Sequence, residues 1–225
     1  KLYGEGQVIQ LGSTIGYREV PYVPLPAGLE RLADALLWID ARTAIVPGLA
    51  QDDGDRVDVM RGEEVQLLGA VAAGLTPPDA LLCQPGTHCK WAVLRDGAVT
   101  GFTTAMTGEL FAMLRSHSVL ASQLERAVTP NEAFRRGVAR GAQQDLAAAL
   151  FGIRAAGVLG KLSPADAASY ASGLLIGSDA APRLEAHSGE PVHVLADPAL
   201  GGLYRAAIET LGGTAHLLDS HAAFV

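Results

Sequence analysis

An α/β fold is the class that this sequence predicts, on three observations. Three short apolar runs with strand character follow one another between residues 80 and 104. Helix start signals and apolar residues at helical spacing dominate the chain after residue 105. Near the C-terminal end, two strand-like runs flank a helical stretch, which favours a strand–helix–strand unit with a parallel pair.

The first 40 residues predict an extended segment and then a helix. Pro21, Pro24 and Pro26 forbid a helix in the first 26 residues, so this part is expected to be extended. From Leu29, apolar residues recur at helical spacing as far as Leu37, which predicts an amphipathic helix that packs by one stripe.

The next segment predicts a strand, a loop and a second helix. Residues 44–46 predict a short buried strand, and the acidic stretch from Asp52 to Asp58 predicts a solvated or ligand-facing loop because it cannot bury itself. Residues 62–74 again show helical spacing, with Glu63 and Glu64 in the first turn, where the helix dipole favours carboxylates.

The middle of the chain predicts an antiparallel meander. Strands are expected over residues 80–83, 91–95 and 98–104, and Asp96-Gly97 is a two-residue hairpin turn between the last two. Three meander strands followed by alternating helices and strands predict an RNase H-like α/β layer.

The second half predicts helices with marked starts. Thr129 to Glu132 supplies an N-cap, a proline at the first helical position and a glutamate three residues on, and Ser163 to Asp166 repeats this pattern. Residues 192–195 and 215–218 predict strands on either side of a helix over about 200–211.

Composition excludes several classes of protein. With 225 residues, 49% of them hydrophobic, the chain can bury a full core. No apolar stretch approaches the roughly 18 to 20 residues of a membrane span, and a net charge of −7 argues against nucleic acid as a partner. The two cysteines, Cys83 and Cys89, predict neither a disulfide framework nor a metal site. We expect a cytoplasmic protein without membrane or nucleic-acid contacts.

The stretch from Gln84 to Trp91 is the most informative for chemistry. It joins a buried strand to a second strand through a turn of small residues, and Lys90 lies at the mouth of that second strand. Such a turn can present backbone N–H groups, a hydroxyl and an ammonium to phosphate oxygens, since Gly86 allows close approach. An ordinary hairpin with Lys90 in water fits the same residues, and the local pattern alone favours it.

Two carboxylates beside an arginine form a second candidate. Arg61 precedes Glu63 and Glu64 at a predicted helix start, where a carboxylate can be held rigidly enough to act as a general base. The alternative is that these acids only suit the helix dipole, which is worth a few tenths to ~1 kcal/mol.

Further polar residues carry weaker signals. Thr107 is placed as the N-cap of a helix that continues through Leu114. Arg18, between two tyrosines, can clamp a carboxylate or simply pack on an aromatic ring. The six histidines form no metal-type spacing, so no metal held by histidine is expected.

The segments MRGEE (60–64), PGTHCKW (85–91) and MTGEL (106–110), in this order, resemble the 2-dehydro-3-deoxygalactonokinase family. The resemblance runs from about Gly12 to the C-terminus. It implies the fold of the actin-like ATPase and sugar-kinase superfamily, with two RNase H-like lobes around a nucleotide cleft. It also implies an enzyme of galactonate breakdown that uses ATP and Mg²⁺ to phosphorylate the 6-hydroxyl of a small sugar acid, 2-dehydro-3-deoxy-D-galactonate.

Site roles follow from the resemblance where the letters match. The second phosphate-binding hairpin of the family corresponds to Gly86, Thr87, His88 and Lys90, with Lys90 nearest the transferring group. The GEE run resembles that of related exopolyphosphatases, which makes Glu64 the better candidate for the base, with Glu63 and Asp58 as further catalytic candidates. Candidates for contacts with the sugar acid are Arg18, Arg61, Thr107 and Glu109, and the choice of Arg18 and Arg61 rests on their charge rather than on a motif. No residue is assigned to the metal.

The resemblance also implies a division of the chain. Residues 1–75 are expected to be a remnant of the first lobe with the interlobe segment, and residues 76–225 an RNase H-like second lobe with a helical insertion. The D-W-G-T/S-T-like motif that opens the family's first lobe has no counterpart here. We therefore expect most of that lobe to be absent, and this chain alone to have lost most of the rate because phosphoryl transfer depends on positioning.

Two rival functions stay open at this point. A phosphohydrolase of the same superfamily is suggested by the GEE run, and a non-catalytic binding protein is suggested by the missing first motif. The sequence also leaves the oligomeric state open, a homodimer included.

Overall fold

The computed structural model describes residues 8–10, 21–220 and 223. The chain forms two compact units. Unit 1 comprises residues 1–84, 90–104 and 218–225, and unit 2 comprises residues 85–89 and 105–217. The predicted lobe boundary at residue 75 concerns the family's two lobes and stays a prediction, since the compact units of this chain are divided differently.

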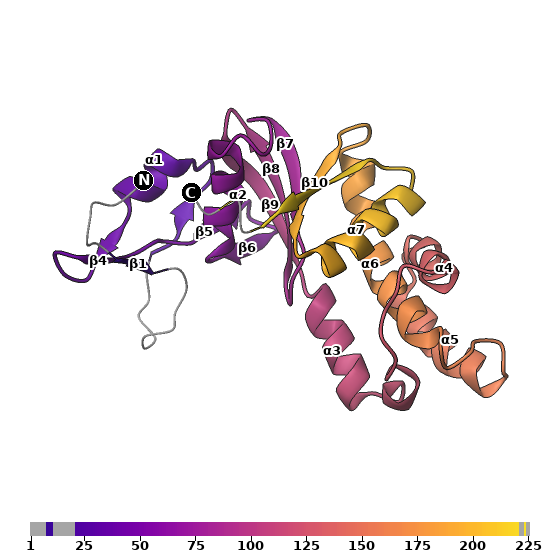
Figure 1. Cartoon of the computed structure of the whole chain (residues 1–225). Helices are drawn as coiled ribbons and strands as arrows, with labels where there is room; N and C mark the ends of the chain where they lie inside the picture. Colours follow the sequence, from indigo (N-terminus) through magenta and orange to yellow (C-terminus); the bar gives the residue numbers. More distant parts are fainter. Residues whose placement is uncertain (1–7, 11–20, 221–222, 224–225) are drawn as a thin grey trace. The chain divides into compact units, whose positions relative to one another are not determined.

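Unit 1 is built from small sheets and two helices (Figure 1). Its elements in chain order are β1 Val8–Gln10, β2 Val23–Pro24, α1 Leu29–Asp34, β3 Leu37–Trp38, β4 Thr43–Ile45, β5 Leu49–Asp52, β6 Val57–Met60, α2 Glu63–Ala72, β7 Ala80–Gln84, β8 Cys89–Arg95 and β9 Ala98–Ala105. The first residue of β8 and the last residue of β9 count with unit 2. One sheet has the order β1-β4-β3 and another β2-β5-β6, each with one parallel and one antiparallel pair. The strands β7, β8 and β9 are consecutive neighbours, with β7 and β8 antiparallel.

The meander predicted for residues 80–104 is present. Asp96 and Gly97 have φ angles of 51° and 74°, as a two-residue turn with both central residues at positive φ requires. The Asp96 N–H donates to Asp79 Oδ1 at 2.8 Å, which fixes the turn against the chain that precedes β7. Leu81, Leu82 and the ring of Trp91 are buried in this part of the core.

Two predictions for unit 1 were wrong. The first helix ends at Asp34 instead of reaching Leu37, because Leu37–Trp38 pairs with β4 as strand β3. The acidic stretch after Asp52 is not one open loop, since residues 57–60 return as β6 and pair with β5. In both places strand pairing outweighs the local pattern.

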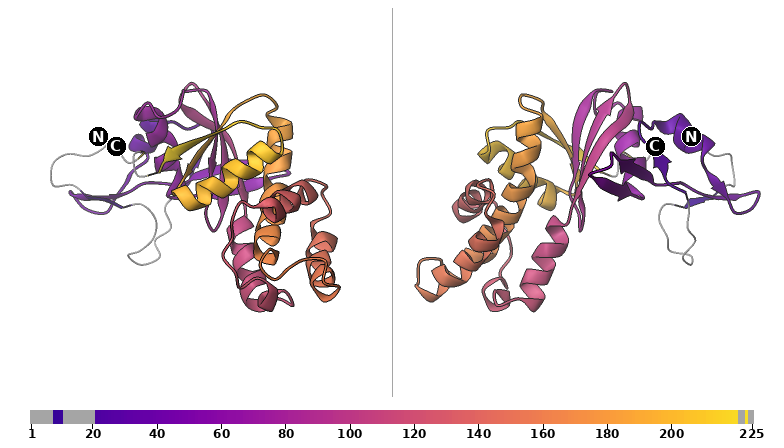
Figure 2. Two further views of the ribbon diagram at one scale, coloured as in Figure 1. Left: turned by 45° about the vertical axis from the view of Figure 1, so that its right-hand side comes forward. Right: turned by 180° about the vertical axis from the view of Figure 1, so that it is seen from behind.

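Unit 2 is mainly helical (Figures 1 and 2). Its elements are α3 Thr107–His117, the short 3₁₀ turn η1 Ala121–Gln123, α4 Glu132–Gly141, α5 Leu146–Val158, α6 Ala167–Ala186, β10 Val192–Ala196, α7 Pro198–Thr210 and β11 Ala215–Asp219, whose last two residues count with unit 1. The predicted strand–helix–strand unit is therefore present as β10, α7 and β11, and β10 and β11 are neighbours in their sheet.

Helices α4 and α6 cross closely in unit 2, because small residues face each other (Figure 2). A Cβ on Gly137 would overlap the backbone of Tyr170, and one on Gly173 would overlap the backbone of Phe134. The hydrophobic core of unit 2 contains the fully buried Leu124, which follows η1, together with residues of α5 and α6.

The helix starts of unit 2 lie later than predicted. The cap of α4 is Asn131, whose side chain accepts the Phe134 N–H at 3.0 Å, and not Thr129. Helix α6 begins at Ala167, because Ser163 and Asp166 bond to each other in a turn before it. Among the described residues, no helix combines the length and apolar character of a membrane span. Both cysteines are buried.

Candidate functional site

The start of helix α2 in unit 1 brings predicted residues together. Gly62 precedes the helix with φ +107°, a conformation that residues with a Cβ rarely adopt, so the chain can turn sharply between β6 and α2. It offers no side-chain cap, and the helix's own acids replace one. Glu64 Oε2 accepts the Gly62 N–H at 2.7 Å, and Glu63 Oε2 accepts the Arg61 N–H at 3.2 Å.

Glu64 is in an unusual state for a carboxylate. The residue is 0% exposed, and its Oε1 is buried with no hydrogen-bond partner. Burial raises the pKa of Glu64 to about 7, the charge of Glu63 adds to this, and the N–H of Gly62 and the charge of Arg61 oppose it. A carboxylate with a pKa near neutrality exists in both protonation states at physiological pH, as a general base requires.

Lys90 is buried beside this helix start. Its side chain is 4% exposed, and its Nζ lies 2.9 Å from Glu63 Oε1. The alternative in which Lys90 lies in water is therefore wrong, although the residues around it do form the expected hairpin. The ion pair offsets the cost of burying the ammonium, and it places a positive charge beside Glu63, the residue before Glu64.

Arg61 and Asp58 have different surroundings in unit 1. The Arg61 guanidinium carbon lies 4.6 Å from the ring centroid of Tyr22, so the side chain packs on an aromatic face. Asp58 Oδ2 accepts the Thr104 N–H at 2.7 Å and lies 3.3 Å from Arg56 Nη2. These contacts tie β6 to β9, whereas those of Glu63 and Glu64 tie α2 to the preceding turn. Arg18 lies outside the described residues.

The turn at residues 86–88 belongs to unit 2, where it rests on the first turn of α3. The Glu109 N–H donates to the Thr87 carbonyl at 2.9 Å, and a Cβ on Gly108 would overlap the carbonyl of Gly86. His88 Nε2 lies 2.6 Å from Glu109 Oε2, and both side chains are partly exposed. The motifs PGTHCKW and MTGEL therefore meet in space, with Thr87 exposed at the helix N-terminus.

Thr107 does not cap α3, contrary to the prediction. It is the first helical residue, the N-cap position is Met106, and no side chain caps the helix. The Thr107 hydroxyl is instead buried and donates to Asp179 Oδ2 at 3.0 Å. Tyr204 donates to the same oxygen at 3.5 Å. Asp179, in α6, thus links the start of α3 and the middle of α7 to its own helix.

Sequence reasoning missed Asp179 as a site-supporting residue. A signal was present, because Asp179 is the one charged residue between Ala167 and Ala180 in a segment of apolar and small side chains. A lone acid in such a buried stretch needs hydroxyl or N–H donors from neighbouring elements. Which elements supply them depends on the tertiary fold.

The described carboxylates do not form a ready metal site. No group of three or more His, Cys, Asp or Glu residues lies close enough to hold an ion in the part of the chain that the structure describes. Glu63 and Asp58 are already paired with Lys90 and Arg56. These residues therefore do not fit a protein-held Mg²⁺, which in kinases is bound largely through substrate phosphates.

Comparisons with known proteins agree on one family. The model of the 2-keto-3-deoxy-galactonokinase family matches residues 9–225. A Rhizobium meliloti protein named 2-dehydro-3-deoxygalactonokinase DgoK1 is 41% identical over 93% of this chain and 71% of its own length. The Escherichia coli 2-dehydro-3-deoxygalactonokinase is 35% identical over 90% of this chain and 69% of its own length. A crystal structure of a 2-dehydro-3-deoxygalactonokinase protein from Sinorhizobium meliloti has a TM-score of 0.88 and 38% identity, covering 97% of this chain and 76% of that one.

Proposed function

Because the chain belongs to the 2-keto-3-deoxy-galactonokinase family, we propose that it transfers the γ-phosphoryl group of ATP to the 6-hydroxyl of 2-keto-3-deoxygalactonate. The new bond joins the sugar oxygen to the γ-phosphorus, the bond from that phosphorus to the bridging oxygen of ADP breaks, and the hydroxyl proton leaves. The protein must therefore hold two polyanionic substrates and accept one proton.

Glu64 is the proton acceptor in this proposal. The observation that carries it is the buried Oε1, which has no partner and belongs to a carboxyl with a pKa of about 7. An oxygen with an unused lone pair can accept a hydroxyl proton, and a near-neutral pKa gives a useful driving force at physiological pH. Because Glu64 is fully buried, the acceptor hydroxyl must reach it through a local opening at the start of α2.

The turn at residues 86–88 is the proposed phosphate contact. Gly86, Thr87 and His88 lie at the N-terminus of α3, where N–H groups and the helix dipole favour an anion. Lys90 follows in β8 and supplies a charge for the transferring group. Its pairing with Glu63 supports this role, since Glu63 can release the ammonium when a more highly charged phosphate arrives.

Arg61 is the proposed contact for the carboxylate of the sugar acid. Its guanidinium is held on the ring of Tyr22 and lies at the same helix start as Glu64. Glu109, paired with His88, and Arg18 remain proposed substrate contacts. Thr107 is proposed to position the start of α3, because its hydroxyl already donates a hydrogen bond to Asp179.

Mg²⁺ enters the proposal only with the ATP phosphates, whose charge it neutralises. No residue of this chain is assigned to it. The cytoplasmic location and the RNase H-like fold also remain proposals. The meander β7–β9 in unit 1 and the unit β10–α7–β11 in unit 2 are the two components that such a layer needs.

The test is acceptor dependence with product identification. The chain is incubated with Mg·ATP and 2-keto-3-deoxygalactonate, its C4 epimer, or no acceptor, and products are followed by ³¹P NMR. The proposal predicts a phosphate monoester coupled to the C6 protons, and little ADP without acceptor. Equal ATP consumption without a sugar acid indicates the phosphohydrolase, and absence of any product contradicts the proposed activity.

A further inference from the structure

A cavity within the helical part of unit 2 has the composition of an anion site. Its volume is about 290 Å³, and α4, α5 and the chain from Lys161 to Tyr170 line it. Two of its lining residues, Ala149 and Ile153, are buried members of the hydrophobic core cluster. Gly152 adds open space, since a Cβ there would meet no atom within 4 Å. The cavity is thus a hollow with an apolar floor.

Three cations surround this hollow and no carboxylate lines it. They are Arg136, Arg140 and Lys161. Arg140 is oriented by Gln143 Oε1 at 3.0 Å and by Asp145 Oδ2 at 3.3 Å. Within the described residues, Arg136 and Lys161 have no ion pair or hydrogen bond from their side chains. Arg136 and Arg140 are also one turn apart, where like charges destabilise a helix by about 0.2–0.5 kcal/mol.

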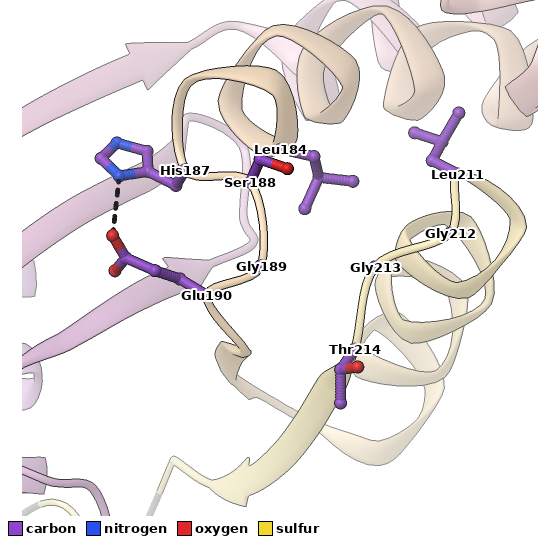
Figure 3. Close-up of a pocket in the computed structure, with 9 residues that line it drawn as sticks. All are labelled: Leu184, His187, Ser188, Gly189, Glu190, Leu211, Gly212, Gly213 and Thr214. Atoms are coloured by element: carbon purple, nitrogen blue, oxygen red, sulfur yellow. Dashed lines mark ion pairs between the residues drawn. The ribbon is translucent and has the colours of Figure 1, made fainter.

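A second cavity of unit 2 lacks these properties (Figure 3). It has a volume of about 150 Å³ and lies between the end of α6 and the turn that follows α7. No Lys or Arg lines it, and its one histidine, His187, lies 3.5 Å from Glu190. The cation-lined hollow is therefore not a general property of the cavities in this unit, and it is unexpected in a chain with a net charge of −7.

We propose that the hollow between α4 and α5 binds a small phosphate monoester. Arginine and lysine together recognise a doubly charged phosphate through directed N–H donors and a mobile ammonium. The apolar floor suits the carbon part of an ester and gives it an advantage over inorganic phosphate. The volume is close to the lower limit of about 300 Å³ for ligand pockets, which suits a three- to six-carbon metabolite. This site does not depend on the proposed kinase function.

The probe is glycerol 3-phosphate, titrated into the ¹⁵N-labelled chain, with glycerol and inorganic phosphate as matched ligands. Saturable shifts are expected at the amides of Gly152, Lys161 and Leu162, with glycerol 3-phosphate binding at least fivefold tighter than inorganic phosphate. Shifts confined to Gly86 and Thr87 would place the ester in the proposed active site and overturn the inference. Equal affinity for inorganic phosphate would overturn the assigned role of the apolar floor.

Two kinds of variant test separately whether binding depends on the positive charges or on the open space at Gly152. Arg136→Gln with Lys161→Gln is expected to weaken binding at least tenfold, and Gly152→Leu is expected to weaken it equally while leaving every charge in place. The control, Arg126→Gln with Arg154→Gln, removes the same charge from residues that do not line the hollow and is expected to bind within twofold of the unaltered chain. Loss in the control, or retention in Gly152→Leu with its amide spectrum otherwise intact, contradicts the site.

Discussion

Each compact unit contains a buried carboxylate near the start of a helix, and the two are satisfied to different degrees. Glu64 in unit 1 is fully buried, receives the Gly62 N–H on one oxygen and has no partner for the other. Asp179 in unit 2 is 7% exposed and receives the hydroxyls of Thr107 and Tyr204 on one oxygen. Glu64 therefore receives few hydrogen-bond donors, whereas Asp179 joins the three helices α3, α6 and α7.

The difference in hydrogen bonding distinguishes a carboxylate suited to proton transfer from one suited to stabilising the fold. A buried carboxylate with an unused lone pair costs stability but is ready to take a proton, and its pKa rises accordingly. A buried carboxylate with donors from distant segments stabilises the arrangement of those segments. We infer that unit 1 carries the reactive group and that unit 2 holds the α3 start, with the turn that rests on it, in place.

The largest effect is expected from Glu64→Gln. The amide oxygen can keep the Gly62 N–H bond, but the side chain can no longer accept a proton. We predict that kcat falls by ~10²–10⁴-fold relative to the unaltered chain, with no loss of melting temperature, because a buried Gln carries no charge. The measurement is ³¹P-detected turnover at saturating substrates beside thermal unfolding. A kcat within threefold of the unaltered value would remove the base from the account.

The neighbouring change Glu63→Gln serves as its control. It leaves the buried Lys90 ammonium without its carboxylate, so stability is expected to fall by ~1–3 kcal/mol. The two adjacent glutamates should therefore differ in stability, since Glu63→Gln lowers the free energy of unfolding and Glu64→Gln does not.

Asp179→Ala should act on stability. It removes the acceptor of two buried hydroxyls and leaves a small cavity, which predicts a loss of ~2–4 kcal/mol in the free energy of unfolding. Asp179→Asn keeps one acceptor oxygen and should lose less than half of that. Urea unfolding followed by circular dichroism provides the values. If Asp179→Ala unfolds within ~0.5 kcal/mol of the unaltered chain, Asp179 is not the junction that we describe.

The pH dependence of stability sharpens the contrast further. The pKa of Glu64 is raised in the folded chain from 4.5 to about 7, so the folded state binds more protons than the unfolded state between these values. Glu64 therefore contributes stability below pH 4.5, and this contribution is lost as the pH rises to 7, by up to roughly 3 kcal/mol. The difference in unfolding free energy between the unaltered chain and Glu64→Gln isolates this effect, and a difference independent of pH would contradict it.

The smallest effect on stability is expected from His88→Gln. The ion pair of His88 with Glu109 is partly exposed, and such pairs contribute at most ~1 kcal/mol. If His88 contacts the ATP phosphates, the KM for ATP should rise several-fold while the melting temperature stays within two to three degrees, as a change below ~1 kcal/mol implies. An unchanged KM would remove His88 from the phosphate contacts and leave only a surface pair.

Much of the fold was predictable from local signals. The hairpin turn at Asp96-Gly97, helix α2 and the unit β10–α7–β11 follow from turn chemistry and periodicity, and the structure has them where the sequence predicted them. The end of α1 was not predictable, because the strand pairing of Leu37 with Ile45 competes with helical spacing. Pairing partners come from elsewhere in the chain, so a local pattern does not contain them.

The candidate site was predictable in its residues but not in its contacts. The motifs named Glu63, Glu64 and Lys90, yet the pairing of Lys90 with Glu63 and the full burial of Glu64 depend on how α2 meets β8. The same holds for Thr107, whose hydroxyl has a partner 72 residues away instead of the local N–H that its position suggested. The assigned roles themselves remain predictions.

The titration of the Glu64 carboxyl decides whether it is a buried proton acceptor. Selective ¹³C labelling of glutamate side chains, with Glu64→Gln to assign the signal, gives its titration curve in the folded chain. We expect a midpoint at about pH 7. A midpoint near 4.5, the ordinary value for glutamate, would show a solvated carboxylate and contradict Glu64 as the buried proton acceptor.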